Sequence, residues 1–287
     1  MSDARYAWTR TKNAVTPVRT MTGQPEPSDR RRTSPDPHRA QDFIVDVRAQ
    51  LRRQGFAWVE GHRVARYVDL SGMAALIAAT STAPMDPYDP TRTRRRFHGR
   101  FVFEPGAGLL HHRGPVAYHQ DRRYNPVDGG GSRWLPPLPA ALACNPTLQS
   151  MIRLDWWCLP APFRRSVAPM PVDVGVHLIA YSPTVTAPSR PSPAVLHKDG
   201  EPFTCVHHLG SRNVSGGESQ VADNSKVMLF EQPLSARLET LLFEDERVYH
   251  GLKPVYAEGV GPASRVVTLV DFTPFFQPHA RARPRWP

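Results

Sequence analysis

Three side chains of metal-binding types, His197, Asp199 and His250, are the first candidates for chemistry in this sequence. His197 and Asp199 stand two residues apart in the segment LHKDG. In an extended backbone residues i and i+2 point to the same side, so an imidazole nitrogen and a carboxylate oxygen can reach one ion. His250 lies in the strand-like segment RVYHGL and can supply a third ligand. The pattern predicts a mononuclear metal site with open coordination positions.

The kind of metal follows from the ligands that are missing. A closed zinc site needs a fourth protein ligand, and the three cysteines form no CxxC pair. Two histidines and one carboxylate on one side of the ion are the ligand set of non-heme Fe(II) oxygenases. A rival HxD pair exists at His119 and Asp121, but its segment YHQDRRYN is polar and loop-like. We expect that pair to make substrate or structural contacts.

A candidate anchor for an anionic cosubstrate is Arg265, fifteen residues after His250 and beyond the turn-rich segment YAEGVGPAS. A strand, a turn and a returning strand would place Arg265 beside the strand of the metal ligand. A buried guanidinium needs a partner, and the distal carboxylate of 2-oxoglutarate matches its fork by bidentate hydrogen bonding. The alternative is a structural ion pair.

Other histidines have less defined roles. His177 lies in VGVHLIAY on the face shared with Gly175 and Tyr181. It either lines the interior near the metal, where it would contact the cosubstrate, or is a core histidine. His207 and His208 are adjacent, so in a regular strand they point to opposite faces and do not serve one metal together.

The elements that must position these side chains change type along the chain. Apolar residues recur at helical spacing over 41–54, and Gly55 supplies a helix stop before the strand-like FAWV. A second helix is predicted over 64–79, followed by a strand at RFHGRFVF. From Asp173 onward, short β-type runs alternate with turns, which favours a sandwich or barrel; the runs are VGVHLIAY, EPFTCVHHL, KVMLF, RVYHGL and RVVTLVDF. One short helix is predicted at Leu234 to Leu242.

Composition divides the chain into a domain and two ends. A length of 287 residues with 40% hydrophobic residues suits one sizeable core, which we place at 39–275. Residues 1–38 are rich in Pro and Arg and are predicted to be a disordered or loosely packed arm, and 276–287 a basic tail. The two ends carry most of the net charge of +10. Basic ends can bind polyanions, but no stacking motif accompanies them, so nucleic acid is not an expected partner.

No segment predicts membrane insertion. The longest apolar run, Met73 to Ala79, is far shorter than the roughly 20 residues that cross a bilayer. An odd number of cysteines, Cys144, Cys158 and Cys205, suggests reduced thiols. We therefore expect a cytoplasmic protein without membrane partners. Its oligomeric state stays open, a homodimer being one option.

Several motifs in a fixed order resemble a known family. They are PSPAVLHKDGEPF, GSRNVSGGES, FEDERVYHGLKPV and RVVTLVDF, with weaker likeness in YHQDRRYNPVDGGGSRWLPPL. Over roughly residues 41–273 the sequence is similar to the bacterial 2-oxoglutarate- and Fe(II)-dependent dioxygenases, the family of L-isoleucine dioxygenase and related free amino acid hydroxylases. The series is considerably more specific than HxD alone.

The resemblance implies a fold, a reaction and roles. The fold would be mainly β within the α+β class, a cupin-like double-stranded β-helix or jelly roll flanked by N-terminal helices. His197, Asp199 and His250 would bind Fe(II), and Arg265 would anchor 2-oxoglutarate. With O2, the enzyme would convert 2-oxoglutarate to succinate and CO2 and hydroxylate an unactivated C–H bond of a small molecule, a free amino acid or derivative. The carboxylate of Asp199 favours hydroxylation over halogenation.

An amino acid substrate needs a cation for its carboxylate and an acceptor for its ammonium group. The candidates for the first role are Arg123, Arg133 and Tyr124, and for the second Asp121 and Glu218. Two alternatives remain open at this point. One is a cupin-like metal-binding protein without oxygenase activity, and the other is a polyanion-binding protein that uses the basic ends.

Overall fold

The computed structural model describes residues 38–124, 129–167 and 170–274. The predicted arm, except residue 38, and the predicted basic tail lie outside the described residues. The helices are α1 Gln41–Gln54, α2 Gly61–Val64, α3 Met73–Ser81, α4 Ala140–Ala143, α5 Pro146–Cys158 and α6 Ala161–Val167. The strands are β1 Phe56–Val59, β2 Arg94–Glu104, β3 Leu109–His112, β4 Tyr118–His119, β5 Ser132–Arg133, β6 Val172–Tyr181, β7 Phe203–Arg212, β8 Val214–Gly216, β9 Glu218–Asp223, β10 Met228–Pro233, β11 Thr240–Glu244, β12 Val248–Leu252, β13 Val255–Ala257 and β14 Ser264–Pro274.

A seven-stranded antiparallel sheet in the order β1-β11-β7-β14-β6-β2-β3 is the base of the domain. Its strands alternate in character because successive side chains point to opposite faces. On β6, Val174, Val176 and Leu178 join the hydrophobic core, whereas His177 and Ile179 face a pocket on the other side. One face of the sheet is therefore structural and the other can carry chemistry.

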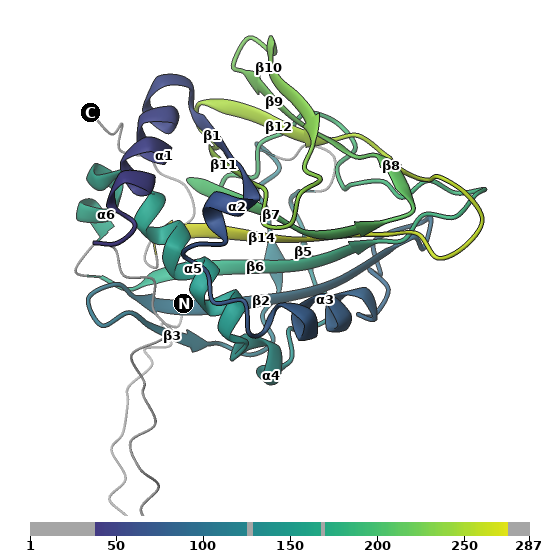
Figure 1. Cartoon of the computed structure of the whole chain (residues 1–287), viewed down its shortest axis with the longest axis horizontal. Helices are drawn as coiled ribbons and strands as arrows, with labels where there is room; N and C mark the ends of the chain where they lie inside the picture. The colour runs from purple at the N-terminus through teal and green to yellow at the C-terminus, as the bar shows by residue number, and fades with distance from the viewer. Residues whose placement is uncertain (1–37, 125–128, 168–169, 275–287) are drawn as a thin grey trace, which may run out of the picture. The chain divides into compact units, whose positions relative to one another are not determined.

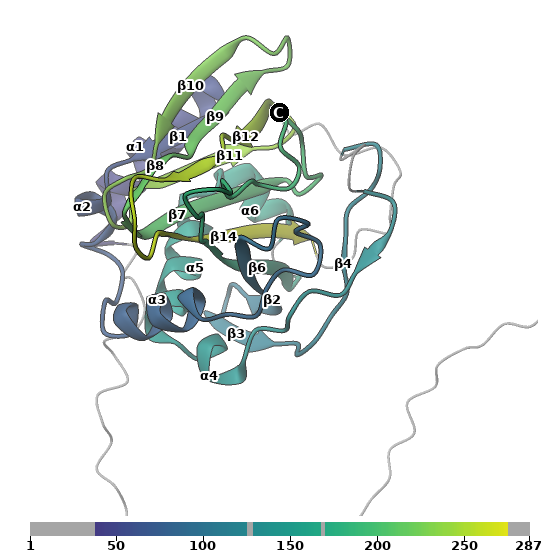
Figure 2. The same cartoon turned by 90° about the vertical axis from the view of Figure 1, so that its right-hand side faces the viewer.

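Helices cover the structural face of this sheet (Figures 1 and 2). The helix α5 contributes Leu148, Met151 and Trp156, all almost fully buried, to a core shared with β6 and β14. Asn145 caps α5 by accepting a hydrogen bond from the Leu148 N–H at 3.1 Å, and Pro146 follows at the first helical position. The rigid support of the sheet is thus built from local helix signals and apolar packing.

The second layer lies over the opposite face and consists of a three-stranded sheet, β10-β9-β12, and the pair β13-β8 (Figures 1 and 2). The segment before β7 joins this layer through two isolated bridges, Ser189 with Val255 and His197 with His250. Two facing antiparallel layers with helices outside are the predicted jelly roll with flanking helices. The pocket lies between the layers.

Two predicted helices are wrong. The first, over 64–79, is interrupted before α3 because Thr147 accepts the Gly72 N–H at 3.1 Å and Ser150 accepts the Asp69 N–H at 2.9 Å. The second, over 234–242, is a turn that leads into β11. The Glu239 carboxylate accepts the N–H groups of Ser235 and Ala236 at 2.6 and 2.9 Å, which fixes that turn.

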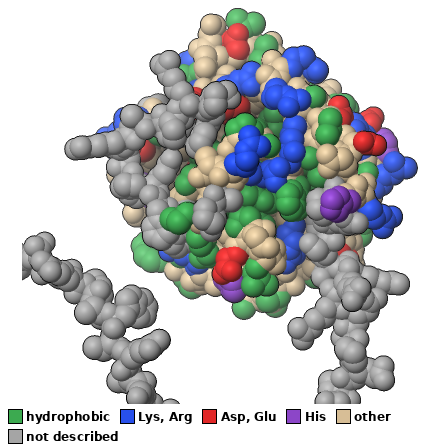
Figure 3. Space-filling view, turned by 90° about the vertical axis from the view of Figure 1, so that its left-hand side faces the viewer, with side chains coloured by type: hydrophobic (Ala, Val, Ile, Leu, Met, Phe, Trp, Pro, Cys, Tyr) green, Lys and Arg blue, Asp and Glu red, His purple; other side chains and the backbone are tan. Residues whose placement is uncertain are grey.

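Two surface properties bear on partners. No helix within the described ranges is long and apolar enough to cross a membrane. Lys and Arg side chains gather on the face that carries α1 and α6 (Figure 3). The last turns of these helices contain Arg52, Arg53, Arg164 and Arg165. Part of the positive charge therefore lies on the folded domain and not only at the ends of the chain.

Candidate metal centre

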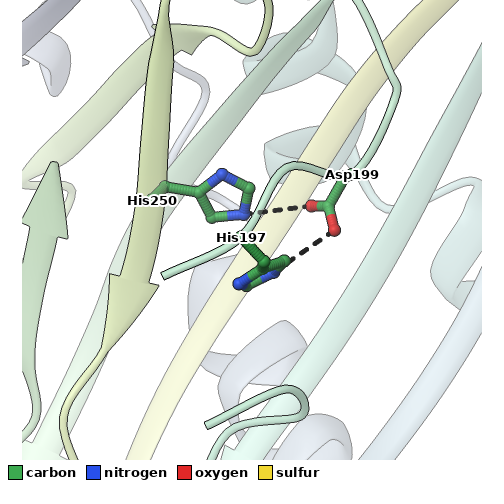
Figure 4. Close-up of side chains that lie close together, drawn as sticks. All are labelled: His197, Asp199 and His250. Carbon is green, nitrogen blue, oxygen red and sulfur yellow. Dashed lines mark ion pairs between the residues drawn. The ribbon is translucent and has the colours of Figure 1, made fainter. Parts of the chain in front are cut away.

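The centre is built on a backbone pair that joins the two histidines. The His197 N–H donates to the His250 carbonyl at 2.9 Å, and the His250 N–H donates back at 3.0 Å. Asp199 follows two residues later and turns its carboxylate toward both rings (Figure 4). Its Oδ1 lies 3.3 Å from His197 Nε2, and its Oδ2 lies 3.2 Å from His250 Nε2. The three predicted ligand groups thus converge, with one ligand atom of each within 4.8 Å of the others.

The turn after His197 is held by a carboxylate that the sequence reasoning did not single out. Asp245, fully buried, accepts the Asp199 N–H on Oδ1 at 2.8 Å and the Gly200 N–H on Oδ2 at 2.9 Å. Gly200 has a φ of +89°, and a Cβ there would lie 2.7 Å from the ring of Tyr124. The glycine and Asp245 together aim the Asp199 carboxylate at the histidines.

The ring orientations favour metal binding through the Nε2 atoms. His197 Nδ1 lies 2.9 Å from the Val195 carbonyl, which can only accept, so Nδ1 carries a proton and Nε2 is the nitrogen that can bind a metal ion. The His250 ring stacks on Phe243 with centroids 4.4 Å apart. Burial opposes ionisation of Asp199, but the charges of His250 and His197 and their hydrogen bonds outweigh it and hold the pKa of Asp199 well below its usual range.

The donor set fits an ion that keeps open positions. In the part of the chain that the structure describes, His197, Asp199 and His250 form the sole cluster of three or more potential metal ligands. A fourth protein ligand, which a closed zinc site requires, is not among them. Two imidazole nitrogens and one carboxylate match the ligands of non-heme Fe(II).

The rival HxD pair does not reach the centre. His119 is exposed, and Asp121 forms an ion pair with Arg123 at 2.8 Å. Tyr118 and Gln120, each one position before a residue of this pair, line the pocket instead. In YHQD the buried residues are therefore Tyr118 and Gln120 and not the predicted pair.

Gln120 connects the centre to a buried arginine. Its Nε2 donates to Asp199 Oδ1 at 2.6 Å, and its Oε1 accepts from Arg133 Nη2 at 2.7 Å. Arg133 also lies over the Tyr118 ring, 5.0 Å from its centroid. No signal in the sequence pointed to Gln120, because its contact with Asp199 spans 79 residues of chain.

Arg265 lies in the same pocket, but the predicted route to it is wrong. Its strand β14 pairs with β6 and β7 in the large sheet, whereas His250 belongs to β12 in the other layer. The two side chains line the same pocket from different layers and are not neighbours on a hairpin. Arg265 is 2% exposed, its Nη1 donates to the Gly217 carbonyl, and its Nε is without a hydrogen-bond partner among the described residues.

The pocket that joins these groups encloses about 970 Å³ of space, part of it open to solvent. His177 lines it, as predicted for an interior histidine, and packs on Tyr118 with centroids 4.8 Å apart. Burial, then His98 and Arg96, lower the pKa of His177 well below its usual value, so the ring is neutral. A contact between His177 and a cosubstrate remains a prediction.

The predicted substrate residues divide into two groups. Arg133 lines the pocket. Asp121, Arg123, Tyr124 and Glu218 are outside its lining, so their assignment to the substrate finds no support in the geometry. Asp121 and Arg123 neutralise each other at the surface. The Tyr124 ring packs beside Gly200, and Glu218 is the first residue of β9, directly before the pocket residues Ser219 and Gln220.

Three charged pocket residues were not predicted: Arg96, Glu201 and Asp271. All three are at least nine-tenths buried. Burial, and then the nearby carboxylates of Asp199 and Asp271, raise the pKa of Glu201 well above its usual range. These residues come from β2, from the loop before β7 and from β14, so only the tertiary fold brings them together.

Comparisons with known proteins agree with this geometry. The sequence profile of the 2OG-Fe dioxygenase family matches residues 78–271. An L-isoleucine-4-hydroxylase from Bacillus thuringiensis is 31% identical over 54% of this chain, and the match spans 65% of that relative, just under two thirds of its length. A 3(1)-hydroxy-L-isoleucine 4-dioxygenase from Pantoea ananatis is 28% identical over 80% of this chain and 96% of its own length.

The fold has a solved counterpart as well. The crystal structure of a bsmA homologue from Methylobium petroleophilum PM1 superposes with a TM-score of 0.73 at 23% identity, over 83% of this chain and 96% of that one. The predicted jelly roll, the predicted enzyme class and the predicted set of Fe(II), 2-oxoglutarate and O2 are confirmed. The chain belongs to the 2OG-Fe dioxygenase family, because its sequence matches the profile of that family over two thirds of the chain.

Proposed function

We propose that His197, Asp199 and His250 bind Fe(II), that Arg265 anchors 2-oxoglutarate, and that the enzyme hydroxylates an unactivated C–H bond of a free amino acid or a close derivative. The observation that carries this proposal is the convergence of the three ligand atoms within 4.8 Å at the wall of a pocket that Arg265 also lines. Bound Fe(II), with 2-oxoglutarate and O2, supplies the oxidation that yields succinate, CO2 and a hydroxylated product.

The residues of this chain bind and orient the reactants. The two Nε2 atoms and the Asp199 carboxylate hold the ion, and Asp245 and Val195 fix the positions of Asp199 and His197. Three protein ligands leave positions for the 2-oxo acid end of the cosubstrate and for O2. The pocket walls of Val206, Leu241 and Phe243 keep water away from this side of the centre.

Arg265 suits the distal carboxylate of 2-oxoglutarate. It is nearly fully buried in the pocket, and burial is the main cause that lowers its pKa from the usual value. A buried guanidinium is costly without an anion, and no carboxylate oxygen within the described ranges forms an ion pair with it. A cosubstrate carboxylate would supply that anion in a bidentate geometry.

The substrate class rests on the relatives. The names of both curated relatives specify isoleucine or a hydroxylated isoleucine as the compound oxidised. The pocket combines aliphatic walls with buried charges, which suits a small zwitterion that has an apolar side chain. We also infer a cytoplasmic enzyme, because Cys144, Cys158 and Cys205 are all free thiols.

The test is a succinate-release assay over the twenty standard L-amino acids with Fe(II) and 2-oxoglutarate under air. We expect Fe(II)-dependent succinate release that at least one amino acid stimulates, with one hydroxylated product per succinate by mass spectrometry. The matched control is His119→Ala, which removes the first residue of the rival HxD pair and should keep turnover. Absence of Fe(II)-dependent succinate in the wild-type protein would refute the proposal.

A further inference from the structure

Two buried arginines line the pocket in addition to Arg265. Arg96 is 8% exposed and Arg133 is 9% exposed. The nearest carboxylate oxygen to Arg96 is Asp86 Oδ2 at 3.6 Å, but that same atom accepts from Arg94 Nε at 2.9 Å. Within the described ranges no carboxylate forms an ion pair with Arg133, whose hydrogen-bond acceptor is the neutral amide of Gln120. Neither guanidinium group therefore has a carboxylate of its own that balances its positive charge.

Hydrogen bonding is also incomplete at these arginines. Among the described residues, Nε of Arg96 and Nε of Arg133 are buried and lack a hydrogen-bond acceptor. Arg100, on the same strand as Arg96, shows the contrast, because it pairs with Asp173 at 2.9 Å and with Asp271 at 3.6 Å. Buried charges in folded proteins are paired or bind a ligand. The unused donors of Arg96 and Arg133 therefore point to an anion from outside the chain.

The fold brings the two arginines to one wall. Arg133 is the antiparallel partner of Tyr118, and the chain that follows it is fastened to β2. There the His98 N–H donates to the Pro136 carbonyl at 2.8 Å and the Leu138 N–H donates to the His98 carbonyl at 2.7 Å. Arg96 lies two residues before His98 on β2, so its side chain points to the same face.

Positive charge near this wall contributes to a low pKa of the neighbouring residue His98. The pKa of His98 is lowered to about 3 by burial first, and then by the charges of Arg100, Arg96 and Arg133. His98 packs on Tyr118 with centroids 5.3 Å apart, beside the ring that also lies under Arg133. Arg96, Arg100 and Arg133 thus place positive charge around His98.

This wall is separate from the anchor for 2-oxoglutarate. Arg96 is on β2 and Arg265 is on β14, and β6 runs between them. Two strand spacings separate their backbones by about 10 Å. Arg133 is linked to the metal centre by Gln120, which donates to Asp199 Oδ1 at 2.6 Å. Arg133 and Arg265 thus reach the pocket from different parts of the fold.

We propose that Arg96 and Arg133 form a second anion subsite, which binds the carboxylate of the substrate while Arg265 binds that of 2-oxoglutarate. This inference rests on the proposed function and deepens it. It makes a free carboxylate an obligatory feature of the substrate and names the two residues that select it. The two guanidinium groups would bind the carboxylate oxygens by charge-assisted hydrogen bonds.

The experiment measures steady-state KM values with the Fe(II)-loaded protein. The amino acid that most stimulates succinate release in the wild-type screen is compared with its own carboxamide, which keeps the size but removes the negative charge and replaces one acceptor oxygen by an N–H donor group. Arg96→Met and Arg133→Met are then assayed, with exposed Arg66→Met as the matched control. Circular dichroism and thermal unfolding check that each variant folds.

We expect the carboxamide to stimulate at least about tenfold less than the acid at equal concentration. Each pocket variant should raise the KM for the amino acid about tenfold or more, well beyond any change in the KM for 2-oxoglutarate, and Arg66→Met should leave both unchanged. Should the variants not fold, the comparison of acid and carboxamide in the wild-type protein still tests whether the substrate needs a free carboxylate.

Three results would overturn the subsite. They are equal stimulation by acid and carboxamide, folded variants whose KM for 2-oxoglutarate rises as much as that for the amino acid, and Fe(II)-dependent succinate release that none of the twenty amino acids stimulates. The last result leaves the dioxygenase assignment standing. Failure of the dioxygenase activity on which the proposed function rests has a different signature, because the wild-type protein would then release no succinate under any condition.

Discussion

The side-chain amide of Gln120 donates a hydrogen bond of 2.6 Å to Oδ1 of Asp199, the carboxylate between the two histidines of the centre. The amide orientation is fixed from both ends, since its oxygen accepts from the Arg133 guanidinium at 2.7 Å and its nitrogen faces a carboxylate. Gln120 therefore restrains the proposed carboxylate ligand of the metal from outside the coordination sphere.

Removal of this hydrogen bond should weaken metal binding. For Gln120→Leu we expect the affinity for Fe(II) to fall about 10- to 100-fold, because hydrogen-bond partners of metal ligands typically contribute that much. Anaerobic calorimetric titration with Fe(II) measures it. His119→Ala is the control, since the side chain of that neighbour is exposed. Unchanged affinity in Gln120→Leu would show that Asp199 is positioned without the amide.

Gly217 should control the position of Arg265. Its φ is +68°, and a Cβ built there would lie too close to Arg265 Nη1 for both to keep their places. Gly217→Ala combines backbone strain of about 1–2 kcal/mol with displacement of the guanidinium. We expect the KM for 2-oxoglutarate to rise about tenfold, measured by succinate release at varied cosubstrate concentration.

The control for that substitution is Gly210→Ala. Gly210 lies on β7, which pairs with the strand of Arg265, and a Cβ there would meet no atom within 4 Å. It should leave the KM for 2-oxoglutarate unchanged. Equal behaviour of the two alanine variants would contradict the role given to Gly217.

Asp245 should matter for both folding and metal binding. Asp245→Ala removes the acceptor of two buried N–H groups, those of Asp199 and Gly200. Each hydrogen bond to a charged group contributes about 1.5–3 kcal/mol, so the free energy of unfolding should fall by several kcal/mol. Urea unfolding of the metal-free protein measures this loss. Asp245→Asn keeps one acceptor oxygen and should lie between the alanine variant and the wild type.

His98 should make the domain less stable in acid. Its pKa is about 3 in the folded protein, against an ordinary value of 6.5 for histidine. Because the folded pKa is depressed, the unfolded chain binds more protons below pH 6.5, and stability is lost as the pH falls from there toward 3. One such histidine contributes a slope of about 1.4 kcal/mol per pH unit.

Urea unfolding of the wild-type protein and of His98→Leu at pH 7, 6 and 5 tests this effect of about 1.4 kcal/mol per pH unit. The difference in unfolding free energy between the two proteins should change in favour of the variant as the pH falls. A difference independent of pH would mean that His98 titrates alike in both states.

Local signals in the sequence predicted the parts of the fold that depend on neighbours in the chain. The helix over 41–54 has the predicted bounds, because its apolar spacing and the left-handed Gly55 agree. The helix predicted over 234–242 is wrong, because the leucines of this segment suit a helix as well as a strand. Its true partners, β1 and β7, are remote in sequence. Long-range pairing decided the outcome there.

The same distinction applies to the site. His197, Asp199 and His250 were identifiable because metal ligands are restricted in type and the HxD spacing is local. Arg96, Gln120 and Asp245 were not, because nothing in their own segments shows that they converge on the centre. For YHQD the prediction depended on strand phase, and the structure turns Gln120 inward and Asp121 outward.

The most direct test of the central claim is the visible charge-transfer absorption of an anaerobic Fe(II) and 2-oxoglutarate complex. The claim predicts that wild-type protein develops this absorption only when both are present, and that His197→Ala, folded by circular dichroism, does not develop it or release succinate in air. Full absorption and turnover in the folded His197→Ala protein would contradict the assignment of the metal centre.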